Sequence, residues 1–307
     1  MVYDVAIIGG GPAGLTAGIY SSLAGHSTVI IEKYMYGGQI TLSHEVKNYP
    51  SYVDIDGTTL AMQMMSQAKS CGVEMRYEEL INFNNLKEQV KEIITNKGTI
   101  KAKTIILAMG AKSKRLGVDG EEKFTGRGVS YCAVCDGSIY KGKNMAVIGG
   151  GNSAFEDAIY LSDLANKVYL VHYKNTYKSN DDLQKRVLKL AEDGKVEILT
   201  PYQVKQINGD KSIENILIKN TETNEIKPLS VGALFIAIGR EPETMLLKEE
   251  IKTDEYGYII TDENMCTSIK GVYACGDIRS KMLRQVITAC SDGAIASTSA
   301  HKYITEN

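Results

Sequence analysis

The sequence predicts an α/β protein in which one strand–helix–strand unit interrupts another. A β-rich run, a glycine turn and an alanine-rich segment follow one another in residues 3–32, and the same order recurs in residues 144–171. Three further apolar runs end in glycine, at residues 104–111, 234–241 and 271–277. Strands that alternate with helical patterns indicate parallel sheets covered by helices. We therefore expect two Rossmann-like, three-layer domains, the second inserted into the first.

The first unit carries a dinucleotide-binding pattern. Gly9, Gly11 and Gly14 fit G-x-G-x-x-G directly after a β-rich run and before the helical segment. Glycines at this spacing allow a tight turn, bring backbone N–H groups close to a pyrophosphate, and pack the helix on the sheet. Glu32 ends the second expected strand, where a carboxylate can bind an adenosine ribose. The pattern predicts an ADP-containing cofactor and disfavours a purely structural turn.

The second unit repeats this pattern with one change. Gly149 and Gly151 form its turn, the helix is expected to run through Leu164, and position 154 holds an alanine, which the motif also allows. Two dinucleotide motifs in one chain predict two dinucleotides and electron transfer between them. One is usually a bound flavin, and the other a diffusible nicotinamide.

The inserted unit sets the expected domain boundaries. The strands at 104–111 and 234–241 flank it on both sides. We predict a discontinuous FAD-binding domain from residues 1–113 and 242–307. Residues 114–241 are expected to form a pyridine-nucleotide-type domain that also carries a C-x-x-C motif.

Composition argues against several kinds of partner. The 307 residues include 35 Lys and Arg against 37 Asp and Glu, a formal charge of −2. This balance disfavours nucleic acid or an anionic membrane as the main partner. The sequence shows no signal-type segment at its start and no apolar run of membrane-spanning length. We therefore expect a soluble, cytoplasmic protein with no nucleic-acid and no membrane partner.

Cys132 and Cys135 form the one close pair among six cysteines. Their C-x-x-C spacing suits a redox dithiol, half of a zinc site, or two buried thiols. A structural zinc site needs four ligands, and the sequence has neither a second C-x-x-C nor closely spaced histidines. We predict no metal site and favour a redox dithiol, with inert thiols as the remaining alternative. Cys275 and Cys290 are expected to serve packing.

Eight short stretches, in a fixed order along the chain, carry a family resemblance. They are GGGPAG, GGQI, NYP, GRGVSYCAVCDG, GGGNSAFEDA, AIGREPET, GVYACGD and RQVITA. With them the chain resembles the low-molecular-weight, bacterial-type thioredoxin reductases, which are class II pyridine nucleotide-disulfide oxidoreductases. The resemblance implies bound FAD, a redox-active disulfide in the nucleotide domain, thioredoxin or a thioredoxin-like protein as electron acceptor, and a homodimer.

The resemblance also implies which residues would bind FAD. The first glycine turn and Glu32 would hold the adenosine and the pyrophosphate, and the GGQI and NYP stretches would lie along the ribityl chain and flavin ring. Asp277 would hold the ribityl or pyrophosphate end, and Arg284 and Gln285 would contact the polar edge of the ring. The implied FAD residues are Gly9, Gly11, Gly14, Glu32, Gly38, Gln39, Asn48, Gly276, Asp277, Arg284 and Gln285.

The same resemblance implies roles within the C-x-x-C motif. Cys135 would face the flavin, Cys132 would attack thioredoxin, and Asp136 would protonate a departing thiolate or take the proton back. In the family the inserted domain rotates between two poses, which offer the flavin first the nicotinamide and then the dithiol.

The nucleotide segment departs from the family pattern. The family carries H-R-R-x-x-x-R, whose arginines bind the 2′-phosphate of NADPH, whereas this chain has HYKNTYK at residues 172–178. Lysine offers a point charge where arginine offers a planar fork. NADPH, NADH and reduced ferredoxin or another carrier therefore all stay open as electron donors, although the intact GGGNSA turn disfavours ferredoxin. The nucleotide residues would be Gly149, Gly151, Asn152, Ser153, Tyr173, Lys174 and Lys178.

Other functions are compatible with part of this pattern. A ferredoxin–nucleotide reductase of the same architecture is disfavoured by the dithiol, and a peroxide-reductase flavoprotein by a first strand that begins at Tyr3. The alternative of another class is a non-catalytic flavin and dithiol redox sensor. Asp136 and the full set of flavin motifs favour an enzyme instead.

Overall fold

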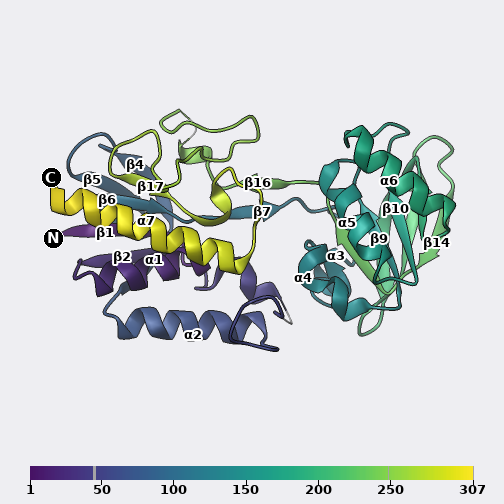
Figure 1. Ribbon diagram of the computed structural model, residues 1–307, viewed down its shortest axis with the longest axis horizontal. Coiled ribbons are helices and arrows are strands. Elements are labelled where there is room, and N and C mark those ends of the chain that lie inside the picture. Colours follow the sequence, from purple (N-terminus) through teal and green to yellow (C-terminus); the bar gives the residue numbers. More distant parts are fainter. Residues whose placement is uncertain (44–45, 248, 307) are drawn as a thin grey trace. The chain divides into compact units, whose positions relative to one another are not determined.

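The structure is a computed structural model, and the chain in it forms two compact units (Figure 1). Unit 1 combines Met1–Lys112 with Glu241–Asn307, and unit 2 is Ser113–Arg240. Each unit contains a largely parallel sheet with helices packed on it, which confirms the predicted α/β class. The residues that the structure describes are 1–43, 46–247 and 249–306.

Unit 1 is built on a seven-stranded sheet whose longest strand is β6 (Gly98–Leu107). One edge of β6 pairs with β1, and its other edge pairs first with β5 and then with β17. The pairings among β1, β2, β3, β6 and β17 are parallel, and those of β4 and β5 are antiparallel. The remaining strands are β1 Val2–Ile8, β2 Thr28–Glu32, β3 Glu74–Tyr77, β4 Leu80–Asn84, β5 Lys91–Thr95 and β17 Val272–Ala274.

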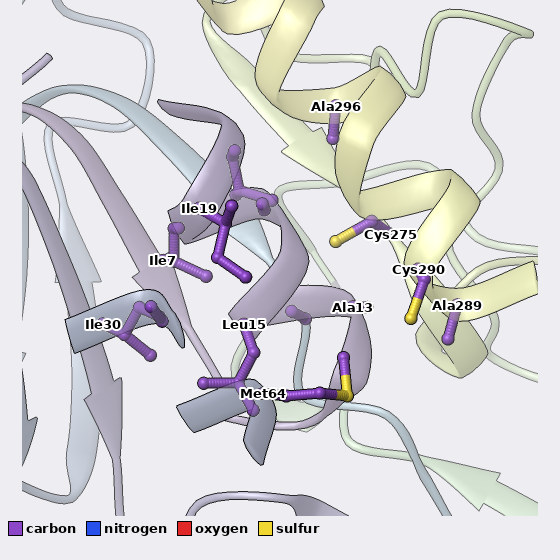
Figure 2. Packing of buried hydrophobic residues seen from close by; sticks show 14 of the residues in the cluster. Ile7, Ala13, Leu15, Ile19, Ile30, Met64, Cys275, Ala289, Cys290 and Ala296 are labelled. Atoms are coloured by element: carbon purple, nitrogen blue, oxygen red, sulfur yellow. The ribbon is translucent and has the colours of Figure 1, made fainter. Parts of the chain in front are cut away.

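Three helices cover one face of this sheet: α1 Pro12–Leu23, α2 Gly57–Ser70 and α7 Val286–Glu306. Figure 2 shows Leu15 of α1, Met64 of α2 and Cys290 of α7 in one cluster of buried hydrophobic side chains. α1 and α7 approach closely because position 293 is glycine, where a Cβ atom would lie 2.2 Å from the carbonyl oxygen of Ala13. The start of α1 is therefore held in place by the last helix.

The opposite face of the sheet is covered mainly by the segment that precedes β17. Leu247, Ile251 and Ile259 are buried there with Ile31 and Ile105 of the sheet. Burying both faces explains why the parallel strands are continuous apolar runs. Unit 1 also contains short 3-10 helices at Gly38–Leu42, Met245–Leu247 and Gly276–Ile278.

Unit 2 is a second three-layer arrangement, as the sequence predicts. Its parallel sheet has the order β11-β10-β9-β15-β8, with α5 (Asn152–Ser162) and α6 (Asp181–Glu192) on one face. An antiparallel sheet of β12, β13 and β14 packs on the other face through Ile216 and Ile218. The strands are β8 Val129–Ser130, β9 Asn144–Ile148, β10 Lys167–Val171, β11 Val196–Leu199, β12 Tyr202–Gly209, β13 Ile213–Asn220, β14 Ile226–Ser230 and β15 Ala233–Ile236. The short helices are α3 Glu121–Phe124, α4 Ala133–Asp136 and the 3-10 helix Gly137–Tyr140.

The chain passes between the units through two short strands. β7 (Ala111–Ser113) and β16 (Arg240–Pro242) pair in a two-stranded sheet, and both unit boundaries lie in it. Among the described residues, none of the helices has the length and apolar character needed to cross a membrane.

The helix expected through Leu164 ends earlier. α5 stops at Ser162, and the N–H of Leu164 donates to the carbonyl oxygen of Leu161, three residues back, at 3.0 Å. A hydrogen bond to the residue three positions back is that of a 3-10 turn, and such turns are common at the C-terminal end of an α-helix.

Candidate active site

The first glycine turn is tight at two positions and open at the third. Gly9 has a φ of +106°, and a Cβ atom on Gly14 would lie 1.9 Å from the carbonyl oxygen of Gly9. By contrast, nothing in the described part of the chain lies within 4 Å of the Cβ position of Gly11. The turn therefore needs Gly9 and Gly14 for its own geometry, whereas Gly11 leaves space for a ligand.

Several distant segments meet at the start of α1. The N–H of Gly37 donates to the carbonyl oxygen of Gly10 at 2.7 Å. A Cβ atom on Gly38 would lie 3.2 Å from Gly11 Cα, and one on Gly276 would lie 2.8 Å from Ala13 Cβ. α1 begins without a side-chain cap and without an acidic residue in its first turn. Such a helix start binds anions, so these residues fit a pyrophosphate.

Glu32 lies at the same turn, at the end of β2. Its Oε2 atom accepts the N–H of Gly10 at 2.8 Å, and its Oε1 atom accepts the N–H of Tyr34 at 3.0 Å. Each carboxylate oxygen has a further lone pair, so Glu32 can still accept a ribose hydroxyl. The carboxylate also stabilises the turn itself, a role that the sequence pattern does not indicate.

A second group of predicted FAD residues lies along two loops of unit 1. Asn48 Nδ2 donates to Gln285 Oε1 at 2.9 Å, which joins the NYP and RQ stretches. The side-chain amide of Gln39 donates to the carbonyl oxygen of Ala111. The Arg284 guanidinium stacks over the Tyr258 ring at 4.2 Å, and its buried Nε finds no hydrogen-bond partner among the described residues. This donor fits an acceptor that the chain does not itself supply.

The glycine turn of unit 2 has the same design. A Cβ atom on Gly149 would lie 2.4 Å from the carbonyl oxygen of Ala237, whereas the Cβ position of Gly151 has no described atom within 4 Å. Ala154 follows where the first turn has Gly14, and it is buried. α5 also begins without a side-chain cap or an acidic first turn. This turn therefore fits a second dinucleotide.

The segment after β10 wraps around that turn. His172 packs on Gly150, where a Cβ atom would lie 2.4 Å from the imidazole ring, and burial lowers the pKa of His172. The N–H of Lys178 donates to the carbonyl oxygen of Gly150 at 2.8 Å. Tyr173 is 52% exposed, and Lys174 Nζ lies 5.2 Å from its ring centroid. The aromatic ring and its lysine therefore face solvent beside the turn.

Of the other predicted nucleotide residues, Asn152 serves the protein itself, because its Oδ1 atom accepts the N–H of Asn180 at 2.9 Å. Ser153 is exposed in the first turn of α5.

An acidic residue that sequence reasoning missed lies beside Tyr173. Glu222, in the turn between β13 and β14, accepts a hydrogen bond from Asn175 Nδ2 at 2.9 Å. Its neighbour Thr221 donates through its hydroxyl to the carbonyl oxygen of Tyr173 at 3.1 Å. No local motif marks Glu222, since it lies 47 residues from Asn175 in the sequence.

The C-x-x-C motif of unit 2 forms a disulfide between Cys132 and Cys135. Cys132 precedes α4, and its Sγ atom accepts the N–H of Cys135 at 3.2 Å. A sulfur that receives a backbone N–H at a helix start is stabilised as a thiolate. Both cysteines are partly exposed, which leaves the bond accessible for exchange.

Asp136 follows Cys135 directly, and its carboxylate accepts a hydrogen bond from a residue of the parallel sheet. Ser130, at the end of β8, donates through its hydroxyl to Asp136 Oδ2 at 2.6 Å. The Ser130 hydroxyl oxygen also accepts the N–H of Cys132 at 3.1 Å. Sequence reasoning identified Asp136 but missed Ser130.

The other cysteines differ from this pair. Cys71, Cys266, Cys275 and Cys290 are free thiols, and burial raises the pKa of the last three. A raised pKa keeps a thiol protonated and unreactive. No group of three or more His, Cys, Asp or Glu side chains in the described ranges lies close enough to hold a metal ion.

Two dinucleotide-type turns and a C-x-x-C disulfide with an adjacent carboxylate define a pyridine nucleotide-dependent disulfide oxidoreductase. Residues 3–293 match the family described as pyridine nucleotide-disulphide oxidoreductase. The chain belongs to this family.

The individual proteins similar to this chain include several thioredoxin reductases. A thioredoxin reductase of Peptoclostridium acidaminophilum is 41% identical, with 100% of this chain and 98% of the relative covered. One of Bacillus subtilis is 40% identical, with 99% and 96% covered. A crystal structure of the thioredoxin reductase from Streptococcus pyogenes matches with a TM-score of 0.95 at 41% identity, over 100% of this chain and 99% of that one. The predicted resemblance to thioredoxin reductases is confirmed, and the protein is an enzyme.

Proposed function

We propose that this enzyme reduces the disulfide of thioredoxin or a thioredoxin-like protein with electrons that pass from a nicotinamide dinucleotide through FAD. The observation that carries the proposal is the Cys132–Cys135 disulfide beside the Asp136 carboxylate, in the same unit as a dinucleotide turn. The thioredoxin reductases among the relatives support the choice of acceptor.

We assign FAD to unit 1 and the pyridine nucleotide to unit 2. These units would correspond to the predicted FAD-binding domain of residues 1–113 and 242–307 and the predicted nucleotide domain of residues 114–241. In unit 1 the pyrophosphate would lie at the start of α1, where Gly11 leaves space and Gly38 and Gly276 approach. Glu32 would bind the adenosine ribose, and Asn48, Gln285 and Arg284 would lie toward the flavin. The remaining residues of this set are Gly9, Gly14, Gln39 and Asp277. When bound, FAD supplies two electrons to the dithiol.

The chain's own residues supply the thiol and proton steps. Two electrons and one proton break the Cys132–Cys135 bond and yield a Cys132 thiolate and a Cys135 thiol. The thiolate attacks one sulfur of the thioredoxin disulfide, whose S–S bond breaks, and the departing sulfur takes a proton from Asp136. Asp136 then removes the Cys135 proton. Cys135 attacks the Cys132 sulfur, which restores the disulfide and releases the second thioredoxin sulfur to be protonated by water.

We propose NADPH or NADH as the electron donor, bound at Gly149, Gly151, Asn152 and Ser153 and flanked by Tyr173, Lys174 and Lys178. The open Gly151 position supports a nucleotide over reduced ferredoxin, because a unit that binds no nucleotide has no need of that space. The exposed Tyr173 ring offers a surface on which adenine can stack. Following the family, we also expect a cytoplasmic homodimer.

The proposal is tested by anaerobic titration of the purified, FAD-loaded protein with NADPH, NADH and reduced ferredoxin in turn. We expect flavin bleaching with a nicotinamide nucleotide, followed by reduction of thioredoxin in a turnover assay. A protein that reduces no disulfide with any of the donors would instead support the non-catalytic redox sensor.

Cysteine variants test the assigned roles. Cys135→Ser should still permit flavin reduction but abolish electron transfer to thioredoxin, because the sulfur that faces the flavin is missing. Cys132→Ser should remove the attacking thiol and also abolish transfer. Loss of flavin reduction in folded, FAD-loaded Cys135→Ser protein would contradict the role of Cys135.

A further inference from the structure

We propose that Ser130 is a positioning residue, which holds the Asp136 carboxylate in place for proton transfer at the dithiol. The inference rests on the proposed disulfide-reductase function. Ser130 takes no part in the thiol and proton steps of Cys132, Cys135 and Asp136 described above.

The hydrogen bonds of Ser130 determine where its single proton points. Its Oγ atom accepts the N–H of Cys132 at 3.1 Å, and it lies 2.6 Å from Asp136 Oδ2. Among the described residues, the hydroxyl has one further acceptor, the carbonyl oxygen of Cys132, at the longer distance of 3.4 Å. A hydrogen bond to a carboxylate is stronger and shorter than one to a neutral carbonyl. The hydroxyl therefore donates mainly to Asp136.

Ser130 belongs to a rigid element, whereas Asp136 does not. Ser130 ends β8 and pairs with Phe235 of β15, and it is 4% exposed. Asp136 is the last residue of α4, a helix of four residues. Without a fixed partner, a side chain on so short a helix can occupy several rotamers. The hydrogen bond from Ser130, which is fixed in the sheet, therefore restricts the rotamers of the Asp136 side chain.

The same hydroxyl contacts both parts of the site. Because it binds the backbone of Cys132 and the side chain of Asp136, it sets the position of the acid relative to the attacking sulfur. A proton-transfer group must lie within hydrogen-bond reach of the sulfur that it serves. Donation to Asp136 also favours the ionised carboxylate that forms when the proton is given up.

Other titratable groups near Asp136 bear on the pH dependence. The dithiol sulfurs are closest in sequence, and burial, followed by the charge of Asp136, raises the pKa of Tyr140. On α5, which packs against α4, burial and the charge of Glu156 raise the pKa of Asp157 to about 7. A change in pH dependence is therefore evidence for the role of Ser130 only where it disappears when Asp136 is replaced.

The test uses Ser130→Ala, Ser130→Thr and Ser130→Val in the FAD-loaded enzyme. The Thr and Val variants differ only by a hydroxyl in place of a methyl group, so they remain informative if Ser130→Ala does not fold. Ser162→Ala is the matched control, since Ser162 is a buried serine of the same unit whose hydroxyl binds the helix carbonyl of Ile159 at 2.7 Å.

We expect Ser130→Ala and Ser130→Val to lower kcat/KM for thioredoxin about tenfold. The limb of the pH–rate profile that depends on Asp136 should move up by about one pH unit, because a donor to the carboxylate is lost. Ser130→Thr and Ser162→Ala should stay within about twofold of the wild-type rate. Flavin reduction by the nucleotide should be unchanged in all variants.

A readout independent of turnover is the alkylation rate of the chemically reduced dithiol by iodoacetamide across pH. The Val variant should shift this profile relative to the Thr variant, because the Asp136 charge acts on the neighbouring thiols.

A double-mutant cycle decides whether Ser130 acts through Asp136. In an Asp136→Asn background, Ser130→Val should change the rate by less than about twofold, since the group that it positions has lost its proton-transfer role. A full tenfold loss in that background would overturn the proposal, and so would wild-type rates and profiles in Ser130→Val. If the wild-type enzyme itself does not reduce thioredoxin, the proposed function fails first, and that outcome is distinguishable from either result.

Discussion

Asp292 of α7 accepts the backbone N–H of Gly276 at 3.0 Å and thereby ties the last helix to the loop that carries Asp277. The same carboxylate binds Arg279 Nη1 at 3.0 Å and Lys281 Nζ at 2.7 Å. All three charged side chains are largely buried, with exposed fractions of 8% for Asp292, 14% for Arg279 and 10% for Lys281. One anion therefore fixes two cations and the backbone of the loop proposed to bind FAD.

Removing this anion should destabilise unit 1. Asp292→Ala leaves Arg279 and Lys281 buried without their partner, and breaking a buried ion pair typically costs about 3–5 kcal/mol. We expect a loss of about 3 kcal/mol in the free energy of unfolding, measured by urea denaturation of flavin-free protein. Glu250→Ala is the control, because its ion pair with Lys87 is exposed and should contribute less than about 1 kcal/mol. Equal losses in the two variants would contradict this account.

The first glycine turn predicts opposite effects for two similar substitutions. Gly14→Ala places a Cβ atom 1.9 Å from the Gly9 carbonyl oxygen, so the backbone must move, at a cost of at least about 2 kcal/mol. Gly11→Ala meets no described atom within 4 Å and has an ordinary φ of −75°, so the flavin-free fold should be nearly unaffected. Its methyl group would enter the open space in which the pyrophosphate is proposed to lie, so bound FAD should fall sharply.

Two measurements on the same preparations separate these effects. Flavin absorbance per protein after gel filtration reports FAD binding, and denaturation of the stripped protein reports the fold without the stabilisation that a ligand adds. Full FAD content in Gly11→Ala would show that the pyrophosphate does not approach at this position.

The buried Lys91 should make the free energy of unfolding increase toward alkaline pH. Its side chain is completely buried in β5, where Nζ donates to the carbonyl oxygens of Glu88 and Lys103, and burial lowers its pKa. Between the lowered folded-state pKa and the unfolded value near 10.4, the unfolded chain binds more protons, so the free energy of unfolding rises with pH. Below the folded-state pKa this contribution is constant.

The matched comparison uses Lys91→Met and Lys101→Met in urea denaturation at several pH values from 7 to 10. As pH rises, the free energy of unfolding of the wild type should increase relative to that of Lys91→Met. Lys101 is 51% exposed and paired with Glu92, so its variant should show no such trend. A pH-independent difference for Lys91→Met would exclude the effect.

The charge of Glu222 should make the enzyme favour NADH over NADPH. Its carboxylate is held by Asn175 beside Tyr173, and a negative charge there opposes a 2′-phosphate. Glu222→Gln should raise the ratio of kcat/KM for NADPH over NADH by roughly fivefold, measured under identical ionic strength. Glu225→Gln, in the same exposed turn, should change the ratio by less than about twofold. Equal effects of the two variants would indicate a general surface-charge effect.

Much of the fold was predictable because its signals are local. The spacing of Gly9, Gly11 and Gly14, repeated at Gly149 and Gly151, is set by the geometry of a strand-to-helix turn, and the structure contains both turns. The C-x-x-C motif is also local, since only two residues lie between the cysteines of its disulfide. Helix ends are less certain from sequence, as the early end of α5 illustrates, because one i→i−3 bond competes with one i→i−4 bond at nearly equal energy.

The α/β class, the two dinucleotide turns and the dithiol could therefore be predicted from the order and spacing of residues alone. Three contacts depend on how the elements pack: Ser130 with Asp136, Glu222 beside Tyr173, and Asp292 with the loop at Gly276. A turn motif depends on backbone geometry over a few consecutive residues, so its residues must appear at fixed spacing. A hydrogen bond between elements depends on how strands and helices pack, and no spacing in the chain records which side chains that packing brings together.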